Sequence, residues 1–148
     1  MSDLYRQLQQ HPFCQGLDAP FVAKLADCAT SVSFAPGDYL AREGSDADAT
    51  YLITAGRVAL RAGRETVETV DDGEPLGWSW LFDGTRWHVD ATAITAVRAV
   101  RLDGPALDAR MHADPAFGHA FARHLLRTVH GRLARARLRS LDTFGGPR

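Results

Sequence analysis

The residues best suited to bind a small molecule gather between Leu76 and Ala93. Arg86 can pair with an anion, whereas His88 can do so only when protonated, near or below its unperturbed pKa of about 6.5. The tryptophans of the chain also lie here, and their rings can stack on a planar ligand, surround a cationic head group or fill a hydrophobic core. Core filling is the commonest use of an aromatic cluster. The three tryptophans are Trp78, Trp80 and Trp87.

Metal and nucleophile chemistry find little support elsewhere in the chain. Cys14 and Cys28 are the only cysteines, whereas a structural zinc site or an iron-sulfur cluster usually takes about four ligands. His88 is the only histidine between Val32 and Leu102, so the neighbouring strands offer no histidine cluster. No Gly-x-Ser-x-Gly motif occurs. The sequence therefore predicts a protein that is not an enzyme and that has no metal site.

Apolar residues with a period of two indicate that short strands surround this stretch. The pattern begins at Ser31 and recurs until about residue 103, with turn signals such as Pro36-Gly37 and Asp71-Asp72-Gly73 between the runs. No segment between the runs is long and periodic enough for a crossover helix. We therefore predict a mainly β fold over residues 31–104, a double-stranded antiparallel β-roll of the jelly-roll kind.

Helices are expected on both sides of the roll. Residues 1–30 predict short helices, with Asp18 as an N-cap. Within residues 105–148, Asp114-Pro115 predicts the start of a helix that continues to Ser140, about 26 residues or roughly 39 Å. One apolar stripe follows this helix and consists of Phe117, Phe121, Leu125, Val129, Leu133 and Ala136. Because so long a helix exceeds a small roll, we favour a homodimer over packing of the whole stripe on the same chain.

Length and composition fit one globular domain. The chain has 148 residues and a mass of 16.2 kDa, with 45% hydrophobic and 24% charged residues. No apolar run approaches the roughly 20 residues of a membrane span, and no basic and apolar secretory signal opens the sequence. We expect a soluble, cytoplasmic protein that does not act at a membrane.

The formal net charge of −1 hides an uneven distribution. Residues 1–109 carry nine basic and sixteen acidic side chains, whereas residues 110–148 carry eight basic and two acidic ones. The arginines of the second part predict a solvated helix face, a dimer contact to the acidic part or a nucleic-acid patch, of which the first two are the commoner uses of such a run.

The residues between Phe34 and Val58 carry a family resemblance. Phe34-Ala-Pro-Gly37, then Glu43-Gly44-Ser-Asp-Ala-Asp48, then Tyr51 and Gly56-Arg-Val58, resemble the first half of the cyclic nucleotide-binding domain of the cAMP receptor protein and of protein kinase regulatory subunits. The resemblance extends over roughly residues 10–142. It implies a β-roll that binds cAMP or cGMP and a long closing helix that forms a dimer.

In that family a phosphate cassette of the form Gly-Glu-x-(small), followed after about eight residues by Arg-(small)-Ala, holds the cyclic nucleotide. The corresponding stretch is residues 76–93, where Gly77 matches the glycine and Trp78 replaces the glutamate. Trp87 or His88 takes the place of the arginine, and Arg86 lies one or two residues early. The segment from Ser79 to Phe82 could form the short helix. The ligand-binding residues implied are Gly77, Trp78, Ser79, Trp80, Arg86, Trp87, His88 and, in the long helix, Thr128.

We therefore interpret the chain as a non-catalytic sensor domain that binds a cyclic nucleotide or another small anionic ligand and signals through its long helix. One alternative is a ligand-free roll, closed by Trp78 and Trp87, that serves as a dimerisation or protein-interaction module. Another is the sensor half of a transcription regulator without its helix-turn-helix, because the chain stops at Arg148 soon after the helix. No specific DNA binding is expected from this length.

Overall fold

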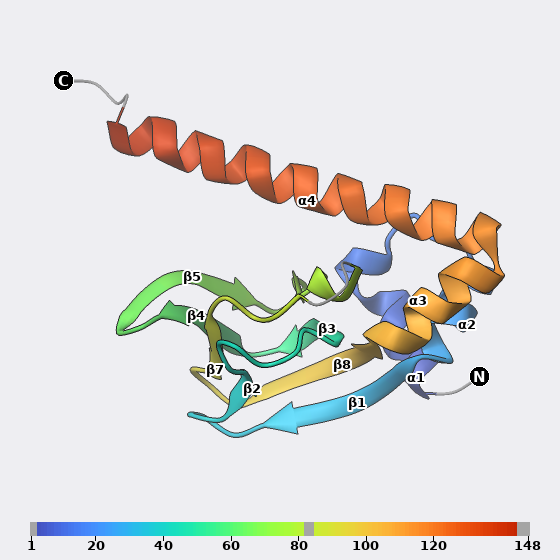
Figure 1. Ribbon diagram of the computed structural model, residues 1–148, viewed down its shortest axis with the longest axis horizontal. Helices are drawn as coiled ribbons and strands as arrows, with labels where there is room; N and C mark the ends of the chain where they lie inside the picture. Colours follow the sequence, from blue (N-terminus) through green and yellow to red (C-terminus); the bar gives the residue numbers. More distant parts are fainter. Residues whose placement is uncertain (1–2, 82–84, 145–148) are drawn as a thin grey trace. The chain divides into compact units, whose positions relative to one another are not determined.

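The computed structural model describes residues 3–81 and 85–144, and within the last helix it describes the side chains as far as Arg135 and at Leu138. The chain divides into two compact units, Met1–Ala109 and Arg110–Arg148 (Figure 1). Each unit is described below by itself.

Antiparallel strands form the first unit. They are β1 (Ala29–Phe34), β2 (Tyr39–Ala41), β3 (Ala49–Ala55), β4 (Arg57–Ala62), β5 (Glu65–Asp71), β6 (Pro75–Leu76), β7 (Asp90–Ala93) and β8 (Val97–Asp103). One sheet has the strand order β1-β8-β3-β6 and the other β2-β7-β4-β5. Figure 1 shows β1, β8 and β3 side by side. The predicted mainly β fold, an antiparallel roll with flanking helices, is confirmed.

Alternation along the strands places one set of side chains inside the roll. Ile53, Val58 and Val70 are fully buried there, because every second residue of a strand points to the same face. The buried cluster that these residues belong to also contains Leu40, Ala41, Leu60, Leu76, Ala91, Ala93, Val97 and Ala99. The core thus lies between the two sheets.

A bulge interrupts β5. Within this strand Val67 is 56% exposed, whereas Val70 is buried. The β4–β5 register shifts between Leu60 and Arg61, so that Val67 has no directly paired residue on β4. A bulge of this kind adds one residue to one strand, so that the residues on its two sides no longer follow a single alternation of faces.

The N-terminal helices confirm the capping signal in the sequence. They are α1 (Asp3–Gln10), the 3-10 turn η1 (Pro12–Cys14) and α2 (Ala19–Ala26). The Asp18 carboxylate accepts a hydrogen bond from the backbone N–H of Phe21, at 2.9 Å, and so caps α2. His11 caps η1 in the same way, since its Nδ1 accepts from the N–H of Phe13 at 3.1 Å.

Two further helices follow the last strand. They are α3 (Gly104–Ala113) and α4 (Pro115–Phe144), so the long helix ends four residues beyond the predicted Ser140. Asp114 caps α4 as predicted, since its carboxylate accepts from the N–H of Phe117 at 3.2 Å. The apolar stripe of α4 changes along its length: Phe117, Phe121 and Leu125 are buried, and Val129 and Leu133 are exposed. Ala136 lies outside the residues whose side chains are described.

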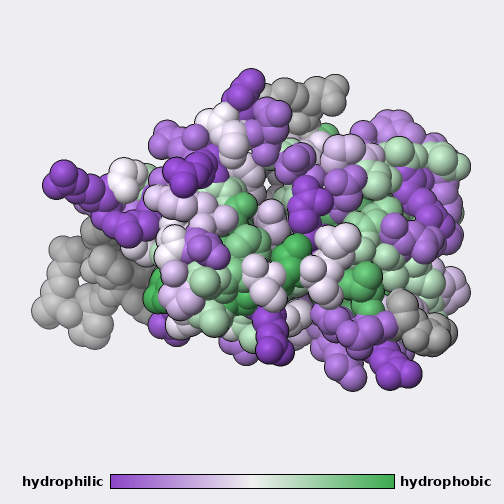
Figure 2. Space-filling model, turned by 90° about the horizontal axis from the view of Figure 1, so that it is seen from below, coloured by the Kyte–Doolittle hydropathy of each residue, from purple (hydrophilic) through white to green (hydrophobic). Residues whose placement is uncertain are grey.

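The surface mixes polar and apolar side chains. On the face shown in Figure 2, hydrophilic residues lie mainly at the periphery and hydrophobic residues lie between them, as in an ordinary folded domain. Across residues 3–81 and 85–144, no helix has the length and hydrophobicity needed to cross a membrane.

Candidate functional site

Gly77 and Trp87 come together inside the roll. Gly77 directly follows β6 and has a φ of +87°, a backbone conformation that glycine adopts without strain. A Cβ atom at this position would lie 2.9 Å from Cη2 of Trp87 and 3.0 Å from the carbonyl oxygen of Ala49. The half-buried Trp87 also packs against the core cluster of the roll. Its ring therefore occupies the space beside the glycine of the cassette.

Arg86 contacts the turn at Gly44–Asp46. Its Nη1 donates to the carbonyl oxygen of Gly44 at 2.9 Å and lies 3.6 Å from a carboxylate oxygen of Asp46, with the side chain 64% exposed. Backbone hydrogen bonds hold the same place, because the N–H of Trp87 donates to Ser45 and the N–H of Gly44 donates to Trp87. In the sequence Arg86 lies one or two residues before the position of the family's cassette arginine. In the structure Arg86 contacts the Gly44–Asp46 turn, whereas Trp87 packs on the core.

The other two tryptophans have separate partners. Trp78 stacks on Phe13 with ring centroids 5.9 Å apart, which links the cassette to η1. Trp80 is buried and donates from its indole N–H to the hydroxyl of Thr50 at 2.8 Å. The same hydroxyl donates to the carbonyl oxygen of Gly77. Trp80 is therefore connected to the cassette glycine by two successive hydrogen bonds through Thr50.

The remaining predicted site residues are dispersed. Ser79 is half-buried and opens the short 3-10 helix η2 (Ser79–Leu81), which agrees with the predicted helical turn. Phe82, the last residue of that expected turn, lies outside the described residues. His88 is exposed. Thr128 belongs to the second unit, where its hydroxyl donates to the carbonyl oxygen of His124 at 3.2 Å.

A cation that the sequence reasoning missed faces the roll interior. Arg101 on β8 pairs directly with Tyr51 on β3, and Tyr51 pairs on its other side with Leu76 of β6. Residues directly opposite in antiparallel strands share a face, and Tyr51 and Leu76 both pack on the core cluster. Arg101 therefore lies on the inner face, two strand spacings or roughly 10 Å from the residue that precedes Gly77.

Carboxylates surround the guanidinium of Arg101. Nitrogen–oxygen distances are 3.6 Å to Asp48 and 3.3 Å to Asp103, and the arginine side chain is 27% exposed. The second carboxylate oxygen of Asp103 accepts from the N–H of Ala106 at 2.9 Å, in the first turn of α3. The Asp103 side chain therefore connects Arg101 directly to the first turn of α3. The signal in the sequence was a charge at a strand position with the same parity as Val97 and Ala99.

Burial also shifts two groups outside the cassette. Desolvation lowers the pKa of His11, although its hydrogen bond to the carbonyl oxygen of Ile53, at 2.8 Å, acts in the opposite direction. Because Nδ1 accepts from Phe13, Nε2 is the atom that carries the proton and donates to Ile53. Burial raises the pKa of the Cys14 thiol to about 12, so this cysteine is a poor nucleophile. The described residues contain no group of three or more side chains arranged to hold a metal ion.

Comparison with known proteins agrees with the β-roll fold. The family model of the cyclic nucleotide-binding domain matches residues 31–114. A CRP-like cAMP-activated global transcriptional regulator of Mycobacterium tuberculosis is 31% identical over 151 residues, which cover 88% of this chain and 67% of that protein. A cAMP-dependent protein kinase regulatory subunit of Emericella nidulans is 28% identical over 97 residues, 64% of this chain and 24% of the subunit.

A solved structure extends the likeness to the whole domain. The crystal structure of a candidate cyclic nucleotide-binding protein of Geobacter metallireducens matches with a TM-score of 0.79 and 27% identity, over 90% of this chain and 99% of that one. This chain belongs to the cyclic nucleotide-binding domain family. The two named relatives are a transcriptional regulator and a kinase regulatory subunit, so the family context is regulatory.

Proposed function

We propose that this chain is a non-catalytic, cytoplasmic sensor domain that binds a small anionic ligand inside its β-roll, with Arg101 as the cation that pairs with the anion. The observation that carries the proposal is the position of Arg101 on the inner face, in one cross-strand row with Tyr51 and with Leu76, the residue that precedes the cassette glycine. Arg86, by contrast, is bound to the Gly44–Asp46 turn.

The proposed signal passes through Asp103. A bound anion competes with Asp48 and Asp103 for the guanidinium, because each is an acceptor for the same N–H groups. Asp103 also caps α3, so loss of its ion pair alters the entry into the helices. Ligand binding then shifts the population between two arrangements of the helix. The size of this shift is set by the difference between the ligand's affinities for the two arrangements.

Thermal unfolding of the native chain with cAMP, cGMP and inorganic pyrophosphate tests the proposal. At 100 times its dissociation constant, a ligand of the folded state adds about 2.7 kcal/mol of stability. We expect stabilisation by at least one of the three, its loss in Arg101→Gln, and its retention in the matched variant Arg86→Gln. Arg101→Lys, which keeps the charge and loses the planar guanidinium fork, is expected to bind more weakly. Equal effects of both glutamine variants would exclude the assigned role.

A closed roll without ligand is the second candidate, and the position of Trp87 favours it. Its indole already fills the space beside Gly77. If no probe stabilises the native chain but one stabilises Trp87→Ala, the indole excludes ligand from the roll. Trp78→Ala is the matched control, because Trp78 stacks on Phe13. Absence of stabilisation in every variant would overturn the sensor proposal.

The proposed assembly is a homodimer through α4. Exposure of Val129, Leu133, Leu126 and Leu138 on one long helix supports it, since apolar residues repeated along a helix usually pack on a partner. A second copy presents the same stripe and forms a symmetric helix pair.

A further inference from the structure

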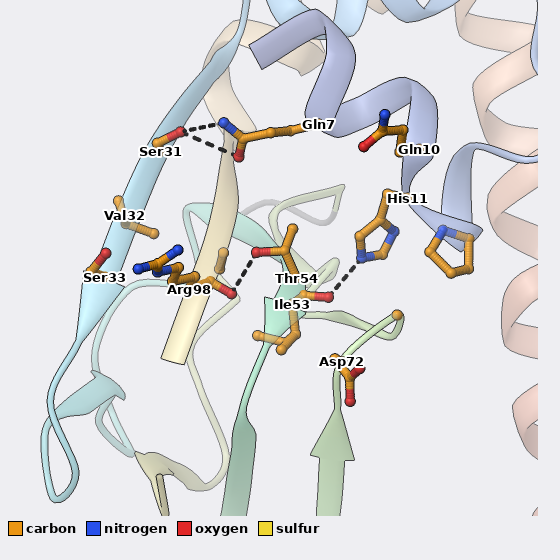
Figure 3. Close-up of a pocket in the computed structure, with 13 residues that line it drawn as sticks. Gln7, Gln10, His11, Ser31, Val32, Ser33, Ile53, Thr54, Asp72 and Arg98 are labelled. Carbon is orange, nitrogen blue, oxygen red and sulfur yellow. Dashed lines mark hydrogen bonds between the residues drawn. The ribbon is translucent and has the colours of Figure 1, made fainter. Parts of the chain in front are cut away.

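A pocket on the outer side of the first sheet is separate from the roll interior. Its volume is about 640 Å³, within the range of small-molecule sites. Gln7, Gln10, His11 and Pro12 line it from the N-terminal helices, as Figure 3 shows for the labelled side chains. The sheet contributes Ser31, Val32, Ser33, Ile53, Thr54, Arg98 and Ala99, and the β5–β6 turn contributes Asp72 and Gly73.

The strand register fixes which side chains face this pocket. Ser33 on β1 and Arg98 on β8 are directly opposite, so their side chains lie on the same face. Val97 and Ala99, the neighbours of Arg98 along the strand, belong to the core cluster and face the other way. Arg98 and Arg101 are three residues apart, and β8 therefore presents one arginine outside the roll and one inside.

Arg98 differs from the other strand arginines in its partners. Arg57 pairs with Asp71, Arg61 donates to a backbone carbonyl, and Arg101 pairs with two aspartates. Among the residues that the structure describes, the guanidinium of Arg98 has no ion pair and no hydrogen bond. An arginine left unpaired in the acidic part of the chain keeps its donors available to a ligand.

Neutral polar groups surround this cation. Hydroxyls of Ser31, Ser33 and Thr54 line the same pocket, with the amide of Gln10 on the helix side (Figure 3). Asp72 is the only carboxylate among the lining residues. The Asp72–Gly73 turn is held against Ile53 by the hydrogen bond from Gly73 N–H to Ile53, whereas Arg98 lies across β3, roughly 10 Å away by two strand spacings. One cation with one distant carboxylate favours a small monoanion over a highly charged one.

We propose that this outer pocket is a second binding site, for a small organic monocarboxylate that also carries an amide or hydroxyl group. Its carboxylate binds the guanidinium of Arg98 and the hydroxyl of Ser33, which lie on one face of adjacent strands. Its neutral polar part extends toward Gln10. This site uses no residue of the cassette, and it stands or falls independently of the sensor function proposed above.

Amide chemical shifts in NMR titrations of the full chain test the site. The probe is N-acetylglycine, and the matched neutral compound is N-acetylglycinamide. We expect millimolar binding of the carboxylate, since the ion pair is partly exposed, with shifts at Ser31, Ser33 and Thr54. The neutral amide is expected to leave these signals unchanged.

Two variants with the same change in net charge separate a specific contact from general electrostatics. Arg98→Gln is expected to raise the dissociation constant roughly tenfold or more, as loss of a hydrogen bond to a charged group does. Arg64→Gln, in the exposed β4–β5 turn, is expected to change it less than about twofold. Unchanged signals outside the pocket verify that Arg98→Gln is folded. Equal loss in both variants, equal shifts by both compounds, or no shift at about 50 mM probe would overturn the proposal.

Discussion

The indole of Trp87 and the backbone of Gly77 share one small space beside β3. The left-handed φ of Gly77 and the absence of a side chain there are both needed for this packing. The family's cassette glycine therefore has a local structural role in this chain, which it fulfils whether or not a ligand binds.

Gly77→Ala is expected to lower the free energy of unfolding by roughly 1–3 kcal/mol, because alanine is strained at positive φ and its Cβ meets Trp87. Urea denaturation measures the change. Gly63→Ala is the matched control, since Gly63 has a φ of +62° and nothing within 4 Å of a built Cβ. If both variants lose the same stability, the contact with Trp87 contributes nothing.

His11 makes stability depend on pH. Its pKa is lowered in the folded chain by burial, so the unfolded chain takes up a proton first as the pH falls through about 6.5. The contribution of His11 to stability is therefore complete above that pH and declines below it. We expect the unfolding free energy to fall more steeply between pH 7 and pH 5 in the native chain than in His11→Asn. An equal slope in the native chain and in His11→Asn would contradict this role of His11.

Single residues of the site were the hardest to predict from the sequence. Gly77 was identified by the cassette pattern, whose turn depends on local backbone chemistry. The partners of Arg86 and Trp87 depend on a one-residue offset in a strand, and Arg98 and Arg101 acquire their different roles only from the pairing of β8 with β1 and β3. These cross-strand pairs join residues that are 43 (Ala55 with Arg98) to 73 (Ala29 with Leu102) positions apart in the chain, and local patterns do not carry them.

At the scale of elements, α4 combines a well-capped start with an apolar stripe that is buried at Phe117 and exposed at Val129 and Leu133. Strands and helix caps were largely predictable, because both depend on local signals. Strands follow the period of two, and each capping aspartate accepts from the backbone N–H three residues later. The bulge at Val67 was not predictable, since it depends on how β5 meets β4.

Replacement of Val129 by aspartate is expected to weaken the proposed α4 dimer, because it places a charge in the apolar stripe. Sedimentation equilibrium measures the dimer dissociation constant, which we expect to rise roughly tenfold or more. His130→Asp, at the exposed neighbouring position, is the control and is expected to have a smaller effect. A monomeric native chain, or equal effects of the two variants, contradicts dimerisation through this stripe.

At the scale of the whole molecule, the two units differ in charge as the sequence indicated. The first unit, residues 1–109, has a net charge of −7, and the second, residues 110–148, has a net charge of +6. Opposite charges of this size attract between molecules as well as within one, and the total near zero removes the repulsion that keeps proteins apart.

We therefore expect association beyond the proposed dimer at low ionic strength near the pI of about 6.6, and we expect this association to decline when salt is added. Static light scattering at increasing NaCl concentration measures this through the second virial coefficient. Association that grows with salt would instead point to apolar contacts, because screening weakens only the charged ones.

The bulged β5 strand has a consequence for how molecules of this kind stay apart. β5 is the outer strand of its sheet, and Glu65 and Glu68 lie on either side of the bulge at Val67. Charge and a broken hydrogen-bonding ladder both make a sheet edge a poor template for a foreign strand. We therefore expect this edge of the roll to resist amyloid-like growth, so that self-association involves the proposed α4 contact instead.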